Sequence, residues 1–291
     1  MKHILTSILL FAALQSAQGQ PAYAEPTFDC RLEADLDRLT IEGLREQRRS
    51  PQGMAFSDGV IFALYDKGYC AAIEAATGRL AGEFPLTGAE GTHCNNASFG
   101  IERAGEDSRF PVLYVSECHA PSRCLVLDIT TAGSRLVQTI RYEGEGIVDF
   151  CDWCVDTGRR HLYAFGKTPE GGAVFKRFAL PSLAEGVEVV LRSGDVLWEQ
   201  AYPAGFFHIP QGSCIDGGYI YCPTGEPRAG SCFIHAIDLE DGRQAALHDI
   251  DRIGLEPEGT FVLDGRLWVL FGGGNGRIYS FDIAQPEAQK L

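Results

Sequence analysis

The stretch Ser50-Pro51-Gln52-Gly53 occurs twice more in this sequence in altered form, as Ile209-Pro210-Gln211-Gly212 and as Glu256-Pro257-Glu258-Gly259. Each copy is followed by residues that favour β-strands, then by a glycine-containing turn and a second apolar run. In the first copy the turn is Asp58-Gly59 and the apolar run is Val60 to Tyr65. Aspartate followed by glycine between two β-forming runs is a strong hairpin signal. The sequence therefore predicts one hairpin module in three places.

Two more divergent modules lie between the first and second copies, beginning near Asn95 and near Asp149. A third strand follows in every module, and modules 1 to 4 also have a fourth strand. In module 3 we expect this fourth strand at Val187–Leu191. Four-stranded units that repeat at an interval of roughly 50 residues are typical of propeller blades. We therefore predict an all-β chain that forms a β-propeller of five four-stranded blades. Six blades are the alternative, with the extra one near residues 27–50.

The fifth module ends too early for a fourth strand, because only eight residues follow Arg277–Ile283. Many propellers close by lending an amino-terminal strand to the last blade, since closure removes an exposed sheet edge. Residues 27–49 carry short β-compatible runs and can supply that strand. A short capping helix over Leu32–Arg45 fits the leucine spacing equally well. We divide the chain into residues 1–24, an amino-terminal segment at 25–50 and the propeller at 51–291.

The first 24 residues have the parts of a secretory signal peptide: Lys2 and His3, an apolar run from Ile4 to Leu14, and Ala22-Tyr23-Ala24 before Glu25. The apolar run is too short to span a bilayer as a helix. We expect cleavage after Ala24 and a secreted or periplasmic protein.

The formal net charge is −14 at pH 7. An acidic surface repels phosphates, so nucleic acids and anionic membranes are not expected as partners. A small molecule, a glycan or another protein fits this charge better.

The chain has ten cysteines, none of them within residues 1–24. An even number in an exported chain indicates disulfides, so we predict a disulfide-stapled fold. Cys118 with Cys124, and Cys222 with Cys232, each flank the loop between a second and a third strand, and we expect both bridges. The partners of the other six cysteines stay open. Cys151-Asp152-Trp153-Cys154 also has the spacing of a zinc knuckle or redox pair, which is the competing interpretation.

The innermost strands of a propeller line its central channel, so polar residues at the start of each first strand converge on one cavity. The candidate ligand-binding residues at these starts are Gln52, His93, Asn95, Asp152, His208, Gln211 and Glu258. The candidate catalytic residues are Glu258, Asp152 and Asp149, because a buried carboxyl with a raised pKa suits a general acid. Carboxylate and amide oxygens also suit calcium. The alternative is a structural one, in which these groups bond to one another and plug the channel.

The last module, Pro257-Glu258-Gly259 followed by Asp264-Gly265-Arg266-Leu267-Trp268-Val269, resembles blades of the gluconolactonase-type and NHL-type propellers. In gluconolactonase-like enzymes a glutamate of this kind belongs to a divalent-metal site. The resemblance implies a corresponding set here of Glu258, Asn95 and either Asp149 or Asp152.

The expected function is that of a secreted propeller that binds a small molecule, a glycan or a protein surface. One alternative is a hydrolase that acts on a sugar lactone or glycan at a cavity centred on Glu258. The other is a protein-interaction scaffold that uses loops such as 101–110. The sequence does not decide whether the protein is an enzyme.

Overall fold

The strand β3 (Val60–Tyr65) is apolar at every position because both of its faces are buried. Successive side chains of a strand point to opposite faces. Phe62 and Leu64 pack against one neighbouring sheet, whereas Ile61 and Ala63 pack against another. A strand of this kind therefore belongs to a sheet that is stacked between two others.

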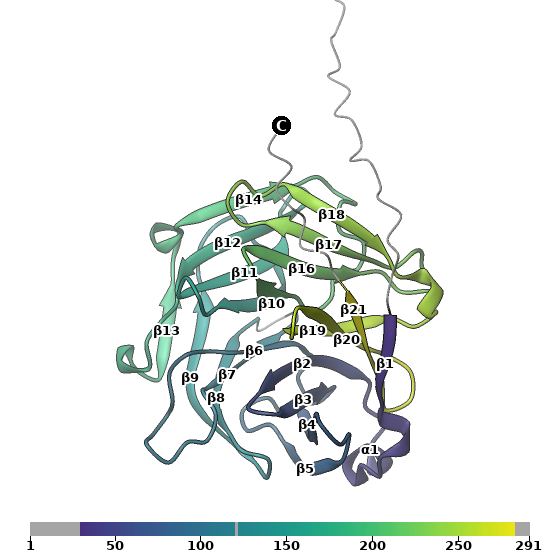
Figure 1. Ribbon diagram of the computed structural model, residues 1–291. Coiled ribbons are helices and arrows are strands. Elements are labelled where there is room, and N and C mark those ends of the chain that lie inside the picture. The colour runs from purple at the N-terminus through teal and green to yellow at the C-terminus, as the bar shows by residue number, and fades with distance from the viewer. Residues whose placement is uncertain (1–29, 120–121, 283–291) are drawn as a thin grey trace, which may run out of the picture.

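The computed structural model describes residues 30–119 and 122–282, whose strands form five sheets around a common centre (Figure 1). Blade 1 consists of β2 (Pro51–Ser57), β3, β4 (Tyr69–Glu74) and β5 (Leu80–Pro85). Blade 2 contains β6 (Cys94–Phe99), β7 (Leu113–Glu117), β8 (Cys124–Ile129) and β9 (Ser134–Tyr142). Blade 3 contains β10 (Asp149–Asp156), β11 (His161–Lys167), β12 (Ala173–Ala179) and β14 (Trp198–Tyr202).

The last two sheets continue the same plan. Blade 4 consists of β15 (Cys214–Asp216), β16 (Tyr219–Thr224), β17 (Phe233–Asp238) and β18 (Gln244–Asp249). Blade 5 consists of β19 (Pro257–Leu263), β20 (Arg266–Phe271), β21 (Arg277–Asp282) and the amino-terminal β1 (Cys30–Asp35). Short helices occupy the connections: η1 (Leu36–Arg38), α1 (Glu42–Glu46), η2 (Leu183–Glu185), η3 (Ser193–Asp195) and η4 (Asp251–Ile253).

Apolar side chains hold the ring together between the sheets rather than in one central core. The buried apolar residues fall into clusters between blades 1 and 2, 2 and 3, 3 and 4, 4 and 5, and 5 and 1. The contact between the last and the first blade closes the ring. The chain is thus a five-bladed β-propeller, which confirms the predicted fold and the predicted number of blades.

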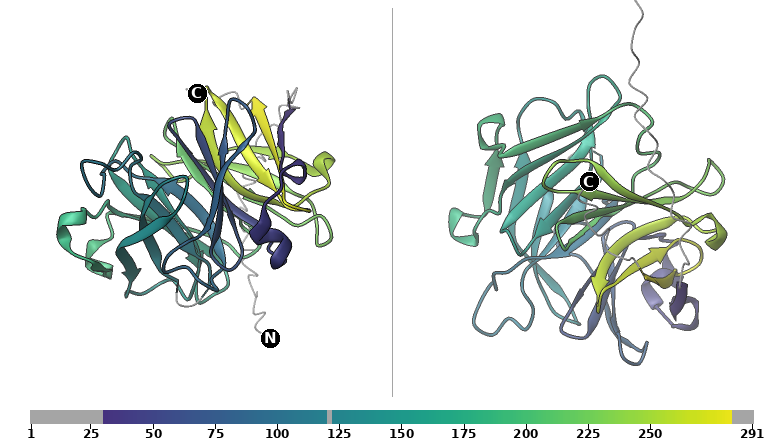
Figure 2. Two further views of the ribbon diagram at one scale, coloured as in Figure 1. Left: turned by 90° about the horizontal axis from the view of Figure 1, so that it is seen from below. Right: turned by 45° about the horizontal axis from the view of Figure 1, so that its top comes forward.

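The fourth strand of blade 5 comes from the other end of the described chain. β1 pairs antiparallel with β21, from Cys30 opposite Phe281 to Asp35 opposite Arg277, and Figure 2 shows the purple β1 beside the yellow β21. η1 and α1 follow directly, and Leu44 of α1 packs in the cluster between blades 5 and 1. Both alternatives for this segment are thus partly realised, a closing strand followed by short helical turns.

The predicted fourth strand of module 3 is corrected by the structure. β13 (Glu188–Leu191) pairs parallel with β9 and adds a fifth strand to blade 2; in Figure 1 it lies at the outer edge beside β9. The Gln138 amide donates to Ser182 O and to Gly186 O, both at 2.9 Å, and so holds the incoming chain against blade 2. The fourth strand of blade 3 is β14, which pairs with β12.

The predicted disulfides are also corrected. All ten cysteines lie among the described residues, and neither Cys118 with Cys124 nor Cys222 with Cys232 forms a bridge. Cys124 pairs with Ser116, two residues before Cys118. Cys222 pairs with a residue three positions after Cys232. An offset of two or three residues, at about 3.3 Å each, takes the α-carbons beyond the roughly 4.4–6.8 Å that a bridge needs.

The predicted signal peptide, residues 1–24, lies outside the described residues. Among the residues that are described, none belongs to a helix with the length and apolar character needed to cross a bilayer.

Candidate functional site

The innermost strands of the blades share an irregularity at one position. In blade 1 the pairing jumps between Pro51 and Met54, and in blade 5 it jumps in the same way between Pro257 and Thr260. β6 and β10 carry the equivalent β-bulge, and blade 4 reaches the same point just before β15. A bulge re-aims a side chain at the end of a strand. The residues at this point, here called the ring position, are Gln52, Asn95, Cys151, Gln211 and Glu258.

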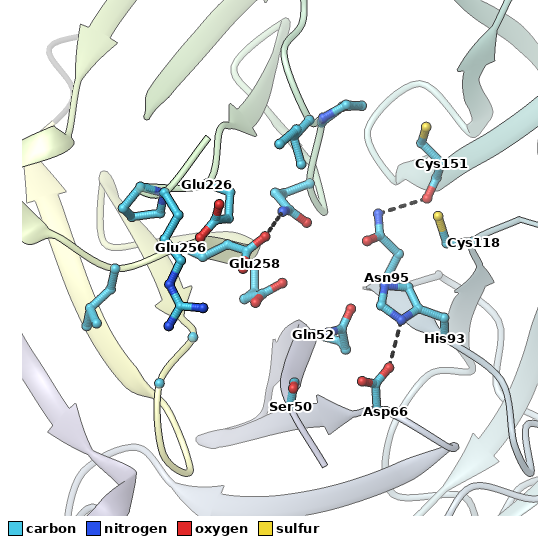
Figure 3. A pocket seen from close by; sticks show the side chains of 18 of the residues that line it. Ser50, Gln52, Asp66, His93, Asn95, Cys118, Cys151, Glu226, Glu256 and Glu258 are labelled. Carbon is cyan, nitrogen blue, oxygen red and sulfur yellow. Dashed lines mark hydrogen bonds and ion pairs between the residues drawn. The ribbon is translucent and has the colours of Figure 1, made fainter. Parts of the chain in front are cut away.

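All five ring residues line one open cavity of about 740 Å³ at this end of the channel. Its wall is completed by side chains from the loops that surround the channel. The polar and charged members among them are Ser50, Asp66, His93, Cys118, His119, Lys167, Glu226, Arg228 and Glu256. Figure 3 shows the three glutamates on one side of the cavity, with Asn95, His93 and the two cysteines on the other.

The channel is closed one residue further along each strand, at what we call the plug position. Three blades have glycine there, and a Cβ on Gly53 would lie 2.7 Å from the Asn96 backbone. Asn96 and Asp152 are the plug residues of the other two blades, and they fill the space that the glycines leave. The Asn96 amide donates to Asp152 Oδ1 at 2.7 Å, and Ser213 N donates to Asp152 Oδ2 at 2.9 Å. Polar groups therefore plug the channel in this layer, and the candidate residue Asp152 is among them, whereas Gln52, Asn95, Gln211 and Glu258 line the cavity.

The acidic side of the cavity is centred on Glu258, which is only 5% exposed. Among the described residues no side-chain hydrogen bond to its carboxyl is found. Burial, together with the nearby charges of Glu256 and Asp66, raises the pKa of Glu258 well above its usual value. Burial also raises the pKa of Glu256, beside Glu226, although Gln211 Nε2 donates to Glu256 Oε1 at 2.9 Å. This side can therefore present a protonated carboxyl to a ligand.

The opposite side carries a histidine–aspartate pair. His93 Nδ1 lies 2.7 Å from Asp66 Oδ1, and this hydrogen bond raises the pKa of His93. Asn95 is anchored nearby, since its amide donates to Cys151 O at 2.8 Å. Between the two sides lies Gln52, whose buried Oε1 has no hydrogen-bond partner among the described residues. An unpaired buried acceptor of this kind favours a ligand that can donate to it.

The structure separates the sequence-predicted residues into two groups. Those that it brings together around the cavity are Gln52, His93, Asn95, Gln211 and Glu258. Asp152 is turned into the plug layer, and His208 is exposed outside the cavity lining. Asp149 binds His119 and Lys167 at the rim, at 3.1 and 3.3 Å.

Sequence reasoning missed Cys151, which occupies the ring position one residue before Asp152. Its place could have been found by counting. Cys151 stands six residues before the turn at Thr157-Gly158, as Gln52 stands six before Asp58 and Glu258 six before Asp264.

The residues that the gluconolactonase-type resemblance implies as metal ligands do not come together. Glu258 and Asn95 line the cavity, but Asp152 is bonded within the plug, and Asp149 is held at the rim. Among the described residues there is no group of three or more histidine, cysteine, aspartate or glutamate side chains arranged to hold a metal ion. The arrangement favours hydrogen bonding over metal coordination.

No protein-family model matches the chain, and no curated protein matches it in sequence. It is similar in structure to the glutaminyl cyclase of Myxococcus xanthus, with a TM-score of 0.51 and 15% identity over 79% of this chain and 89% of that one. It is also similar to the PQQ-bound aldose sugar dehydrogenase of Streptomyces coelicolor, with a TM-score of 0.51 and 12% identity over 89% of this chain and 99% of that one. These likenesses show the fold alone.

Proposed function

We propose that this protein binds a small neutral molecule, rich in hydroxyl or amide groups, in the cavity at the end of its channel. The observation that supports this most directly is a pair of buried groups on cavity-lining residues, Gln52 Oε1 and the Glu258 carboxyl, which have no hydrogen-bond partner among the described residues. A buried polar group costs free energy when it lacks a hydrogen bond. A bound ligand supplies the missing partners.

The chemistry of the wall favours a neutral ligand over an ion. A raised pKa keeps the Glu258 carboxyl protonated at higher pH than an ordinary glutamate, so it donates one hydrogen bond and accepts others. The Gln52 oxygen accepts a hydrogen bond. A sugar hydroxyl or an amide offers both a donor and an acceptor, and a cavity of about 740 Å³ holds a molecule of one or two sugar rings.

Calorimetry tests this proposal with a panel of neutral sugars, sugar lactones, small amides and calcium. We expect at least one neutral compound to bind, and Gln52→Ala to weaken its binding about tenfold, the value of one hydrogen bond. Glu240→Gln is the matched control for Glu258→Gln, because Glu240 lies in an exposed turn between β17 and β18. Equal binding by wild type, Gln52→Ala and Glu258→Gln would place the ligand elsewhere.

A second candidate function is hydrolysis of a sugar lactone or glycan, and the Glu256–Glu258 pair favours it. Two carboxyls in different environments can divide the roles of acid and base. Glu258 is buried and would donate the proton, whereas Glu256 is nearer to solvent and bonded to Gln211. The two similar structures are enzymes, a glutaminyl cyclase and a sugar dehydrogenase. Loss of turnover in Glu258→Gln with retained ligand binding would support catalysis. If the protein is instead a scaffold that acts through loop 101–110, Glu258→Gln should leave its partner binding unchanged.

We also propose that the protein acts outside the cytoplasm. The basic start, the apolar run Ile4 to Leu14 and Ala22-Tyr23-Ala24 support export. Amino-terminal sequencing of the protein made in its host should begin at Glu25. A mature protein that begins at Met1 would contradict export by this route.

A further inference from the structure

Two of the ten cysteines, Cys118 and Cys151, line the cavity, and they come from adjacent blades (Figure 3). Cys151 occupies the ring position on β10 of blade 3. Cys118 follows the last residue of β7 in blade 2. Both cysteines therefore border the same cavity, with Cys118 partly exposed and Cys151 buried.

Backbone contacts hold Cys118 beside the residue that precedes Cys151. Cys118 Sγ lies 3.5 Å from the carbonyl oxygen of Phe150, the residue just before Cys151, and His119 N donates to the same oxygen at 3.0 Å. Cys118 N in turn donates to His93 O at 3.0 Å. The two thiols are close enough for each to shift the pKa of the other. Two neighbouring thiols on adjacent blades can approach each other to form a disulfide.

The surroundings distinguish the two sulfur atoms. The neighbouring Cys151 thiol, together with the rings of His119 and His93, lowers the pKa of Cys118, against the effects of burial and of Asp149. The same interaction between the thiols, with deeper burial, raises the pKa of Cys151. The thiolate is the nucleophilic form of cysteine, so Cys118 is the reactive member of the pair.

The other cysteines lie away from the cavity lining. Cys70 and Cys94, for example, are buried in the apolar cluster between blades 1 and 2, and burial raises the pKa of both thiols. Cysteines buried in apolar surroundings are inert. The cavity pair is thus distinguished from them by access, by mutual contact and by its histidine neighbours.

We propose that Cys118 and Cys151 form a redox-active pair that exchanges with small organic disulfides able to enter the cavity. The Cys118 thiolate attacks one sulfur of the small disulfide, the bond between its two sulfurs breaks, and one small thiolate leaves. The Cys151 thiol then gives up its proton and attacks the Cys118 sulfur, which releases the second small thiolate. Two cysteine thiols are oxidised to one disulfide, the small disulfide is reduced to two thiols, and the two cysteine protons end on them. This pair acts independently of any ligand proposed above.

The test treats the reduced full-length chain with oxidised glutathione at pH 7, blocks the remaining thiols and maps the peptides without reduction. We expect a Cys118–Cys151 disulfide as the first product. Cys118 should react about fivefold faster than an ordinary exposed cysteine, given its lowered pKa and the accompanying loss of intrinsic nucleophilicity. The rate should rise through a midpoint near pH 7.

Three single variants separate the roles of the two sulfur atoms. Cys151→Ser should accumulate a stable glutathione adduct on Cys118, whereas Cys118→Ser should form neither adduct nor bridge. Cys232→Ser is the matched control, because Cys232 lies outside the cavity lining and its thiol pKa is raised to about 11, and it should leave the bridge unchanged. A first bridge between other cysteines, or an adduct on Cys118 no faster than on the rest, would overturn the proposal. The disulfide mapping of the wild-type chain tests the proposal without any variant. A variant that fails to fold therefore does not prevent a decision.

Discussion

Glu258 and Asp152 are both buried carboxyl groups in the channel, on adjacent layers of the same ring. They are 5% and 1% exposed, and burial raises the pKa of each. Their partners differ. Asp152 accepts hydrogen bonds from Asn96, from Ser116, and from both the backbone and the hydroxyl of Ser213. The Glu258 carboxyl has no such bond from the described residues and faces the cavity.

The difference shows how burial alone misleads as a guide to function. A carboxyl that joins three blades through its hydrogen bonds contributes to stability, because donors such as the Ser213 N–H would otherwise be buried without a partner. A carboxyl that is buried without partners costs stability, and proteins keep such groups mainly at sites of binding or catalysis. The two groups should therefore respond to mutation in opposite directions.

The largest effect is expected for Asp152→Ala. The change leaves the Ser213 N–H buried without an acceptor and removes one of the bonds of the Asn96 amide, which keeps its bond to Ser213 O at 2.7 Å. It also removes the acceptor of the Ser213 hydroxyl, and each orphaned donor costs roughly 1–3 kcal/mol. We expect the free energy of unfolding, measured by urea denaturation, to fall by about 3 kcal/mol or more. Asp152→Asn keeps one acceptor oxygen and should lose less. A loss below about 1 kcal/mol in Asp152→Ala would mean that the plug layer is not held together by this carboxyl.

A smaller effect of opposite sign is expected for Glu258→Gln. In the unfolded chain the carboxyl ionises near the ordinary glutamate pKa of 4.5, but in the folded protein it stays protonated to higher pH. The unfolded state then binds fewer protons, so wild-type stability falls as pH rises above about 4.5, by at most about 1.4 kcal/mol per pH unit, until the folded pKa is passed.

Glu258→Gln removes this contribution. The variant should match wild type near pH 4 and be more stable by about 1 kcal/mol or more at pH 7, as measured by urea denaturation at both pH values. The matched variant Glu240→Gln should follow the wild-type curve throughout. Parallel curves for wild type and Glu258→Gln would show that Glu258 ionises normally.

Much of the fold could be predicted from the sequence because its signals are local. Apolar runs and Asp-Gly turns define hairpins within about fifteen residues, as at Val60 to Tyr65 after Asp58-Gly59. The strand at 188–191 was also recognised, but not the sheet that it joins. Its parallel pairing with β9 depends on bonds from Gln138 to residues more than forty positions away. Such contacts have no local signature.

The ring position was predictable for the same reason, since Gln52, Gln211 and Glu258 each precede a glycine that the plug layer requires. The pairing of Asp66 with His93 was not, because the two residues come from different strand ends and meet only in the folded ring. The contact of Cys118 with Cys151 likewise depends on how blade 2 packs against blade 3.

The smallest effect is expected for Asp66→Asn, which tests the comparison from the cavity side. The hydrogen bond from Asp66 raises the pKa of His93, so the charged pair stabilises the fold fully below the unfolded histidine pKa of about 6.5 and is lost as pH rises through the folded value. Because His93 and Asp66 are 41% and 29% exposed, solvent screens the pair and the loss should be below about 1 kcal/mol. In an NMR titration the variant should show a lower His93 pKa.

The same variant compares the two carboxyls. The charge of Asp66 raises the pKa of Glu258, so the pKa of Glu258 should fall in Asp66→Asn. Asp66 does not contribute to the pKa of Asp152, so that pKa should stay unchanged. A shift of both carboxyls together would mean that the cavity and the plug titrate as one unit.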